Sequence, residues 1–166
     1  VIIAGPTASG KTATAIKIAT ALGTVIISAD SRQLYKELPI GTAAPNNEEL
    51  SQVKHYMIHN LSVEDKYNVA DYENEVLSLL NKLFLEYDSV VLTGGSGLFI
   101  DAVCNGLDIM PDISDEIRNN VNDLYAKGGI SALQNEVKRL DPEYYNIVDK
   151  HNHRRLQRAL EVCYQT

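Results

Sequence analysis

The chain has 166 residues, of which 45% are hydrophobic, so it is long enough for one domain with a real core and a small appended lobe. Its formal charge of −7 argues against broad, sequence-blind adhesion to nucleic acid, because that binding comes mainly from phosphates neutralised by Lys and Arg. No apolar run approaches the roughly 20 residues that span a bilayer, and no signal peptide is apparent. Two distant cysteines, Cys104 and Cys163, suit a reducing compartment, so we expect a cytoplasmic monomer without membrane contact.

The first part of the chain alternates predicted strands with predicted helices. Residues 1–4 form an apolar run, and a loop then leads into a helix over residues 12–22 that Gly23 ends. Further buried strands are predicted over residues 25–29 and 89–93. Such alternation implies a parallel sheet with right-handed crossovers, whose ligands gather at the C-terminal ends of the strands.

The rest of the chain is predominantly helical. Asn68 is the predicted N-cap of an amphipathic helix, whereas residues 38–47, with two prolines and one glycine, predict a loop. After Pro111 the pattern changes to short helices. Ser114 caps the first of these, Gly128-Gly129 ends it, residues 130–140 form the next, and a final helix begins near Asn152.

The stretch G-P-T-A-S-G-K-T, residues 5–12, matches G-x-x-x-x-G-K-[ST] and lies between a predicted strand and a predicted helix. In such a loop the backbone N–H groups converge on an anion at the positive end of the helix. Lys11 adds a point charge for the phosphoryl oxygens, and the Thr12 hydroxyl can bind Mg²⁺. The residues predicted to bind a diphosphate are Gly5, Pro6, Thr7, Ala8, Ser9, Gly10, Lys11 and Thr12.

The sequence lacks an acidic residue at a position where a hydrolytic ATPase or GTPase usually has one. Such proteins usually hold the metal with a second acidic residue at a strand end, but the strand over residues 89–93 continues into G-G-S-G without a carboxylate. The acid at a strand end is Asp30, in S-A-D-S-R-Q-L-Y. From the residues alone it is a metal partner, a general base or an N-cap, and these alternatives stay open.

Six stretches together resemble the tRNA dimethylallyltransferases, also called tRNA isopentenyltransferases. They occur in the order of that family and cover nearly the whole chain. The six are G-P-T-A-S-G-K-T, D-S-R-Q-L-Y, I-G-T-A-A-P, Y-N-V-A-D-Y, G-G-S-G-L-F and R-R-L-Q-R-A-L-E-V. The resemblance implies an α/β fold with a P-loop NTPase-like parallel sheet flanked by helices and a small helical insertion.

The same resemblance implies the transfer of a dimethylallyl group from its diphosphate to N6 of adenosine 37 in tRNA, with release of diphosphate. The loop then holds a prenyl diphosphate together with Mg²⁺. Asp30 takes the role of general base, Lys11 neutralises charge, and Thr7 lies near the amine and the donor. The target base must leave its stack to reach such a site.

By resemblance, two groups of residues contact the anticodon stem-loop of the tRNA. The first group surrounds the extruded adenosine, and the second group includes a run of arginines within one helical turn. The positions are Asp30, Ser31, Arg32, Gln33, Ser96, Arg118, Arg154, Arg155, Leu156, Gln157 and Arg158.

The predicted domains follow from this resemblance. Residues 1–110 form the catalytic core, residues 111–150 the helical insertion that binds the anticodon stem, and residues 151–166 a helix that returns to the core. The family continues with further helices beyond this point, and both ends of the chain look cut, so we expect a piece of a longer protein.

The chain also departs from the family pattern. The family commonly has lysine where this chain has Ala44, so a phosphate contact by that side chain cannot form here. Ser96 replaces the usual threonine and keeps a hydroxyl, whereas Phe99 replaces a frequent tyrosine and lacks one.

Three other functions share parts of the pattern. An adenylate isopentenyltransferase that acts on free adenine nucleotides has the same loop and base. A P-loop small-molecule kinase or a non-catalytic nucleotide-binding module binds ATP in preference to dimethylallyl diphosphate.

Overall fold

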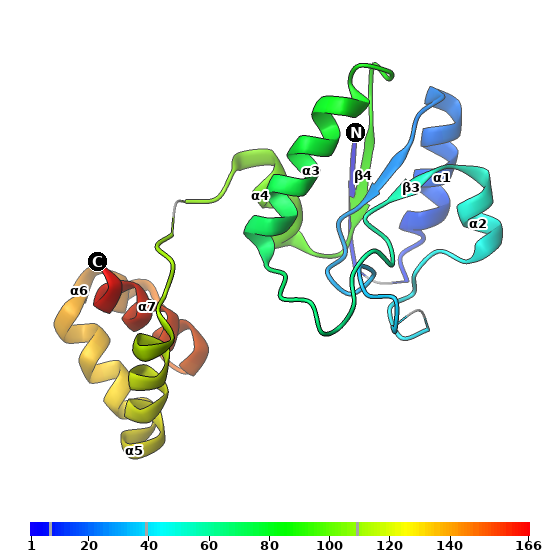
Figure 1. The fold of residues 1–166 in the computed structure, drawn as a ribbon. Helices are drawn as coiled ribbons and strands as arrows, with labels where there is room; N and C mark the ends of the chain where they lie inside the picture. Colours follow the sequence, from blue (N-terminus) through cyan, green and yellow to red (C-terminus); the bar gives the residue numbers. More distant parts are fainter. Residues whose placement is uncertain (7, 39, 109) are drawn as a thin grey trace. The chain divides into compact units, whose positions relative to one another are not determined.

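The computed structural model describes residues 1–6, 8–38, 40–108 and 110–166. It divides the chain into two compact units, Val1–Leu107 and Asp108–Thr166, which are drawn in Figure 1. Each unit contains hydrophobic core residues of its own.

The first unit is built around a four-stranded parallel sheet with the order β1-β4-β2-β3. The strands are β1 (Ile2–Ala4), β2 (Ile26–Ser28), β3 (His55–Tyr56) and β4 (Val91–Gly94). Three of them lie within or beside the predicted strands, which confirms the α/β class. The edge strand β3 was not predicted, because two residues are too few to show a strand pattern.

Helices cover both faces of this sheet, as Figure 1 shows for α1 on one side and α3 and α4 on the other. Successive strand residues point to opposite faces. Ile26 therefore packs with α1 (Lys11–Leu22), whereas Ile27 packs in a second cluster with residues of α3 (Val69–Leu83) and α4 (Gly97–Asn105). The short helix α2 (Asn47–Gln52) precedes β3.

Local sequence signals fix several helix ends. Gly23 ends α1 with a positive φ of 61°, and the Asn68 side chain caps α3 in a capping box with Asp71. Both ends were predicted. The helices α2 and α4 were not.

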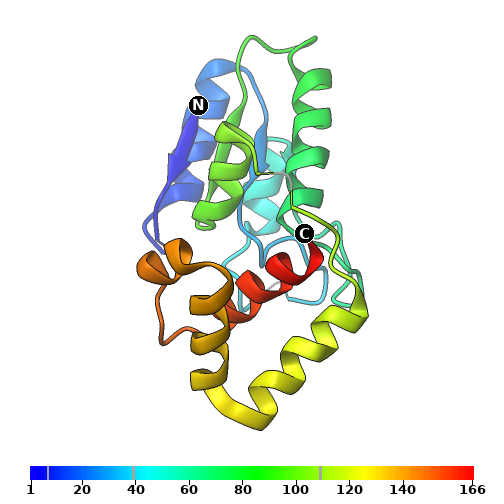
Figure 2. The same ribbon diagram turned by 90° about the vertical axis from the view of Figure 1, so that its left-hand side faces the viewer.

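The second unit consists of α5 (Asp115–Leu140), α6 (Pro142–Ile147) and α7 (His153–Gln165). Gly129 has φ 62° and ψ −162°, so α5 is two helices that meet at a sharp bend, visible in Figure 2. This break confirms the predicted stop at Gly128-Gly129. Within this unit α7 packs on α5 through Leu156 and Leu160, both fully buried. The predicted split between an insertion, 111–150, and a returning helix, 151–166, stays a prediction.

None of the helices in the described ranges is both long enough and apolar enough to cross a membrane.

Gly94, at the end of β4, allows the backbones of β4 and β2 to approach closely. A Cβ atom at this position would lie 2.0 Å from Ala29 O and 2.2 Å from Ala29 C. Main-chain atoms cannot move aside as a flexible side chain can, so any side chain here would force the two strands apart.

We therefore expect Gly94→Ala to lower the free energy of unfolding by at least about 3 kcal/mol, because overpacking here displaces backbone. Urea unfolding measures the change. The matched control is Gly97→Ala, three residues later, where a Cβ would meet nothing within 4 Å. That control should change stability by less than about 1 kcal/mol, since Ala is the better helix former; equal losses in the two variants would contradict the close approach.

Candidate active site

The loop between β1 and α1 presents open backbone donors. Gly10 is the N-cap of α1 with φ 81°, no side chain of the described residues caps the helix, and its first turn contains no acidic residue. By contrast, α2 and α3 begin with asparagine caps and acidic residues. Ala8 also has a positive φ of 63°, which a non-glycine residue rarely adopts and which is typical of functional loops. The start of α1 therefore suits an anion.

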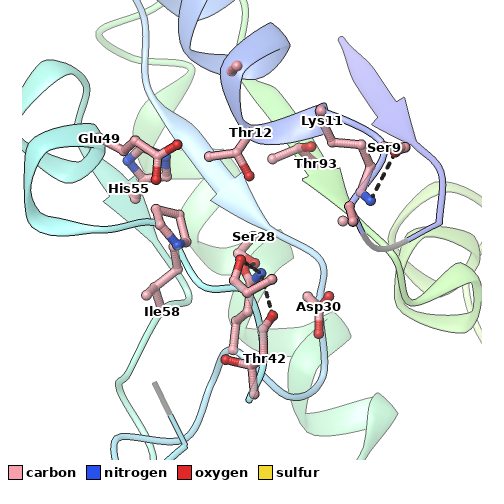
Figure 3. Close-up of a pocket in the computed structure, with 17 residues that line it drawn as sticks. Ser9, Lys11, Thr12, Ser28, Asp30, Thr42, Glu49, His55, Ile58 and Thr93 are labelled. Atoms are coloured by element: carbon pink, nitrogen blue, oxygen red, sulfur yellow. Dashed lines mark hydrogen bonds between the residues drawn. The ribbon is translucent and has the colours of Figure 1, made fainter. Parts of the chain in front are cut away.

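Lys11 lies against this loop. Its Nζ donates to Pro6 O and approaches Ser9 Oγ at 3.5 Å, while Ser9 Oγ donates to Pro6 O at 2.8 Å. Figure 3 shows Lys11 and Ser9 together on one side of the site. A phosphoryl oxygen at this position competes with these neutral acceptors for the ammonium group and offers a full charge instead. Thr7, which with Lys11 is a predicted catalytic residue of the loop, lies outside the described residues.

Asp30 lies two residues after the end of β2 and is held in a turn. Its Oδ1 accepts from Arg32 N at 3.1 Å, and its main-chain oxygen accepts from Gln33 N at 3.1 Å. Ser31 N donates to Ser96 Oγ at 2.9 Å, and Ser96 N donates to Ala29 O at 3.1 Å. The D-S-R-Q and G-G-S-G stretches therefore fix each other, and one oxygen of Asp30 forms the turn bond.

Gly95 brings Asp30 close to the phosphate loop. A Cβ atom at Gly95 would lie 3.5 Å from Asp30 Oδ2 and 3.6 Å from Gly5 O. The carboxylate and the first residue of the loop thus approach the same point. The C-terminal ends of β1, β2 and β4 meet here, as the sequence predicted for a parallel sheet.

The end of β2 is also held from the opposite face. Tyr72 is fully buried, its hydroxyl donates to Ser28 O at 2.8 Å, and its ring stacks on Phe99 at a centroid distance of 4.1 Å. The stretch Y-N-V-A-D-Y therefore positions the strand that carries Asp30. Phe99 contributes ring stacking at a position that needs no hydroxyl for that contact.

These elements enclose a cavity of about 330 Å³, drawn in Figure 3. The described phosphate-loop residues from Ala8 onward, Asp30 and Gln33 all line it. Its other walls come from the segment that includes α2 and β3 and from the end of β4. The lining residues are Ala8, Ser9, Gly10, Lys11, Thr12, Ala13, Ser28, Asp30, Gln33, Thr42, Ala43, Pro45, Glu49, His55, Ile58, Thr93 and Gly94.

The wall that contains Glu49 and His55 was not predicted from the sequence. Figure 3 shows both side chains on the side of the cavity opposite Lys11. Thr12 lies between this pair and Lys11. Glu49 also closes the capping box of α2, where its Oε2 accepts from Asn46 N at 2.9 Å. That capping box, N-x-x-E, is the one signal in the sequence that could have located α2.

His55 is fixed in one orientation. Its Nδ1 lies 2.8 Å from Val53 O, so in the neutral ring this nitrogen carries the proton and Nε2 is an acceptor. Burial lowers the pKa of His55, although the bond to Val53 and the charge of Glu49 both favour the protonated ring. The wall opposite Lys11 therefore offers acceptors rather than positive charge.

The remaining predicted RNA contacts lie in the second unit. Arg118 and Arg158 pair loosely with acidic neighbours on their own helices, at 3.9 Å from Asp115 and 3.2 Å from Glu161. Arg154 and Arg155 are exposed at the start of α7.

Two other predicted contacts in the 154–158 run, Leu156 and Gln157, interact with residues of the same unit. Leu156 is fully buried in the core of this unit, so its side chain is not available to RNA; a contact of its main chain stays a prediction. Gln157 donates to Asn122 Oδ1 at 2.9 Å.

A family model described as IPP transferase matches residues 33–166. The chain belongs to the IPP transferase family. It is 47% identical over 166 residues to tRNA dimethylallyltransferase 2 of Azobacteroides pseudotrichonymphae and 48% identical over 166 residues to tRNA dimethylallyltransferase 1 of Bacteroides fragilis. These alignments cover 100% of this chain and 54% or 55% of the relatives, so the chain spans about half their length.

Solved structures of this family share the fold. The full-length tRNA isopentenylpyrophosphate transferase of Bacillus halodurans matches with a TM-score of 0.62 and 30% identity, covering 99% of this chain and 55% of that one. A eukaryotic dimethylallyltransferase acting on tRNA matches with a TM-score of 0.80 at 22% identity, covering 99% of this chain and 41% of that one, which supports the fold alone.

His55 gives a testable pH dependence. Its pKa is lower in the folded than in the unfolded protein, so the unfolded state binds more protons between the two values and stability rises with pH there. The stabilisation is present above the unfolded value, about 6.5, and is lost as pH falls through the folded value. We expect His55→Asn, which keeps a donor for Val53 O, to lose less stability than the wild type between about pH 7.5 and 5. Parallel urea midpoints across this range would contradict the assignment.

Proposed function

We propose that the complete protein, acting as a cytoplasmic monomer, transfers a dimethylallyl group from dimethylallyl diphosphate to N6 of adenosine 37 in tRNA. The observation that carries this proposal is that Asp30 and the phosphate loop line one cavity. Membership of the IPP transferase family supports the same reaction.

In this reaction the N6–C bond forms as the C–O bond to diphosphate breaks. The leaving group takes the electron pair of the broken bond, so negative charge develops on the diphosphate oxygens. The open amides at the start of α1 and the ammonium of Lys11 stabilise that charge. Because these groups are already fixed around the cavity, they reorganise little as the charge develops.

Asp30 accepts the proton that leaves the amine. The exocyclic amine of adenine is a poor nucleophile because its lone pair is conjugated with the ring, so removal of its proton assists bond formation. Asp30 Oδ1 is engaged by Arg32 N, whereas Oδ2 points toward Gly95 and the loop. We therefore assign Oδ2 of Asp30 as the oxygen that accepts the proton.

The oxygen donors of the cavity fit Mg²⁺. The Thr12 hydroxyl lines it together with the carboxylates of Asp30 and Glu49, and no cluster of three or more His, Cys, Asp or Glu forms a metal cage within the described residues. Mg²⁺ is commonly bound by few protein oxygens together with substrate phosphates and water. Thr12 would hold the ion, which when bound supplies further neutralisation of the leaving diphosphate.

The tRNA contacts are proposed at both units. Ser31, Arg32 and Ser96 lie at the turn beside Asp30, where an extruded base would arrive. On the second unit Arg118, Arg154, Arg155 and Arg158 provide positive charge for phosphates of the anticodon stem. Gln157 lies on α7, as do Arg154, Arg155 and Arg158.

The first test is transfer itself. The complete protein, incubated with Mg²⁺, dimethylallyl diphosphate and an anticodon stem-loop carrying adenosine 37, should increase the mass of the RNA by one dimethylallyl group. A stem-loop with guanosine at that position is the control and should gain nothing. A parallel incubation also contains ATP: if ATP is turned over while the RNA keeps its mass, the kinase alternative replaces the transferase. In another, AMP replaces the stem-loop, and modification of AMP alone would indicate the adenylate alternative.

A second test addresses the base. Asp30→Asn keeps an oxygen that can accept from Arg32 N, so the turn should persist while the proton acceptor is lost. We expect kcat to fall by about 10²–10⁴ with little change in the affinity for pyrophosphate. Single-turnover rates and calorimetry measure the two quantities, and an unchanged rate would exclude Asp30 as the base.

A further inference from the structure

Gln33 stands in the D-S-R-Q stretch, to which the family resemblance assigns tRNA contact, but its partly buried side chain is hydrogen-bonded to other residues of the chain. We propose that Gln33 is a positioning residue that holds residues 42–43 as a wall of the donor cavity, and that it does not contact tRNA. This inference rests on the proposed function only in naming the donor as dimethylallyl diphosphate.

The side-chain amide of Gln33 forms three hydrogen bonds. Ser28 Oγ donates to its Oε1 at 2.9 Å, and its Nε2 donates to Thr42 O at 3.3 Å and Ala43 O at 3.2 Å. Both protons of the amide are thereby used. The orientation is unambiguous, because the reversed amide would place an oxygen against two carbonyl oxygens.

Residues 42–43 need such support. Ala43 has φ 49°, a left-handed conformation that a residue with a side chain adopts only when its surroundings impose it. Thr42 is buried, and its Oγ1 donates to Leu38 O at 2.8 Å. Gln33 binds the carbonyl oxygens of both residues, so it opposes relaxation of this turn. Thr42 and Ala43 line the cavity directly.

The same residue connects this wall to the catalytic turn. Gln33 N donates to Asp30 O at 3.1 Å, and His59 N donates to Gln33 O at 2.8 Å. Ser28, at the end of β2, completes the link. The wall and the carboxylate of Asp30 are therefore positioned from one point, so Gln33 couples the shape of the donor cavity to the position of the base.

The neighbouring Arg32 provides a contrast within the same stretch. Arg32 is exposed, and its main-chain N, not its side chain, binds Asp30. Adjacent residues of this stretch thus have different surroundings: the exposed Arg32 suits RNA, whereas Gln33 suits the donor cavity.

The test is Gln33→Met, which keeps side-chain length and removes all three hydrogen bonds. We expect KM for dimethylallyl diphosphate to rise about tenfold while KM for the stem-loop changes by less than about twofold. Hydrogen exchange of the amides at 42–44 should become roughly tenfold faster. Gln33→Glu should behave in the same way, because its carboxylate keeps the Ser28 bond but faces two carbonyl oxygens.

Arg32→Ala is the matched control. It should raise KM for the stem-loop and leave both donor KM and exchange at 42–44 unchanged. The inference is overturned if Gln33→Met weakens stem-loop binding while donor KM and exchange stay at the wild-type values.

Two readouts do not depend on the proposed reaction. Hydrogen exchange at 42–44 and calorimetric affinity for inorganic pyrophosphate test the wall even if the wild type transfers no dimethylallyl group. If exchange is then faster and pyrophosphate binding weaker in Gln33→Met, the positioning role of Gln33 is supported and only the transferase proposal is refuted. Wild-type values for both quantities would overturn the proposal that Gln33 holds residues 42–43. Urea unfolding identifies any variant that has merely lost global stability.

Discussion

The close contact between the backbones of β4 and β2 at Gly94 and Ala29 is the constraint on which the site depends. It allows the ends of these strands to lie side by side, so the turn that carries Asp30 and the loop that carries Ser96 can exchange hydrogen bonds. Gly95 then leaves room for the carboxylate beside the phosphate loop. The absence of a side chain at Gly94 and Gly95 thus brings Asp30 close to the loop between β1 and α1.

The start of α1 also explains how an acidic chain can offer a site that suits an anion. The formal charge is −7, yet the start of α1 has no acidic side chain in its first turn. The favourable field there comes from oriented backbone amides and one lysine, and it is strong only near the helix end. The net charge of a protein governs long-range association, whereas the local backbone determines whether a phosphate is held.

Much of the fold and the centre of the site could be predicted from the sequence, because those elements carry strong local signals. The strands β1, β2 and β4 are apolar runs, Asn68 and Gly23 mark helix ends, and the phosphate loop is a dense motif. The short elements α2, β3 and α6 could not be predicted in this way. They have two to six residues, too few for a periodic pattern. The local signals at α2 and α6 are cap residues, the N-x-x-E box and Asp141 with Pro142, whereas β3 depends on its tertiary contacts.

The outer wall of the cavity escaped prediction for a related reason. Glu49 and His55 line the cavity because they belong to α2 and β3, two elements that were not predicted. Neither residue type alone indicates a binding site. Gln33 and Leu156 were assigned to RNA as members of matched stretches. A stretch that matches a family contains residues with different neighbours, so hydrogen bonding and burial separate their roles where sequence order cannot.

The two units have separate cores, one pair of clusters within residues 1–107 and a third cluster within 108–166. This separation has an evolutionary consequence. Substitutions that repack α5, α6 and α7 alter a core that shares no residue with the sheet, so the surface of this unit can diverge while the residues that line the cavity of the first unit are preserved. The two units can therefore vary at different rates within one lineage.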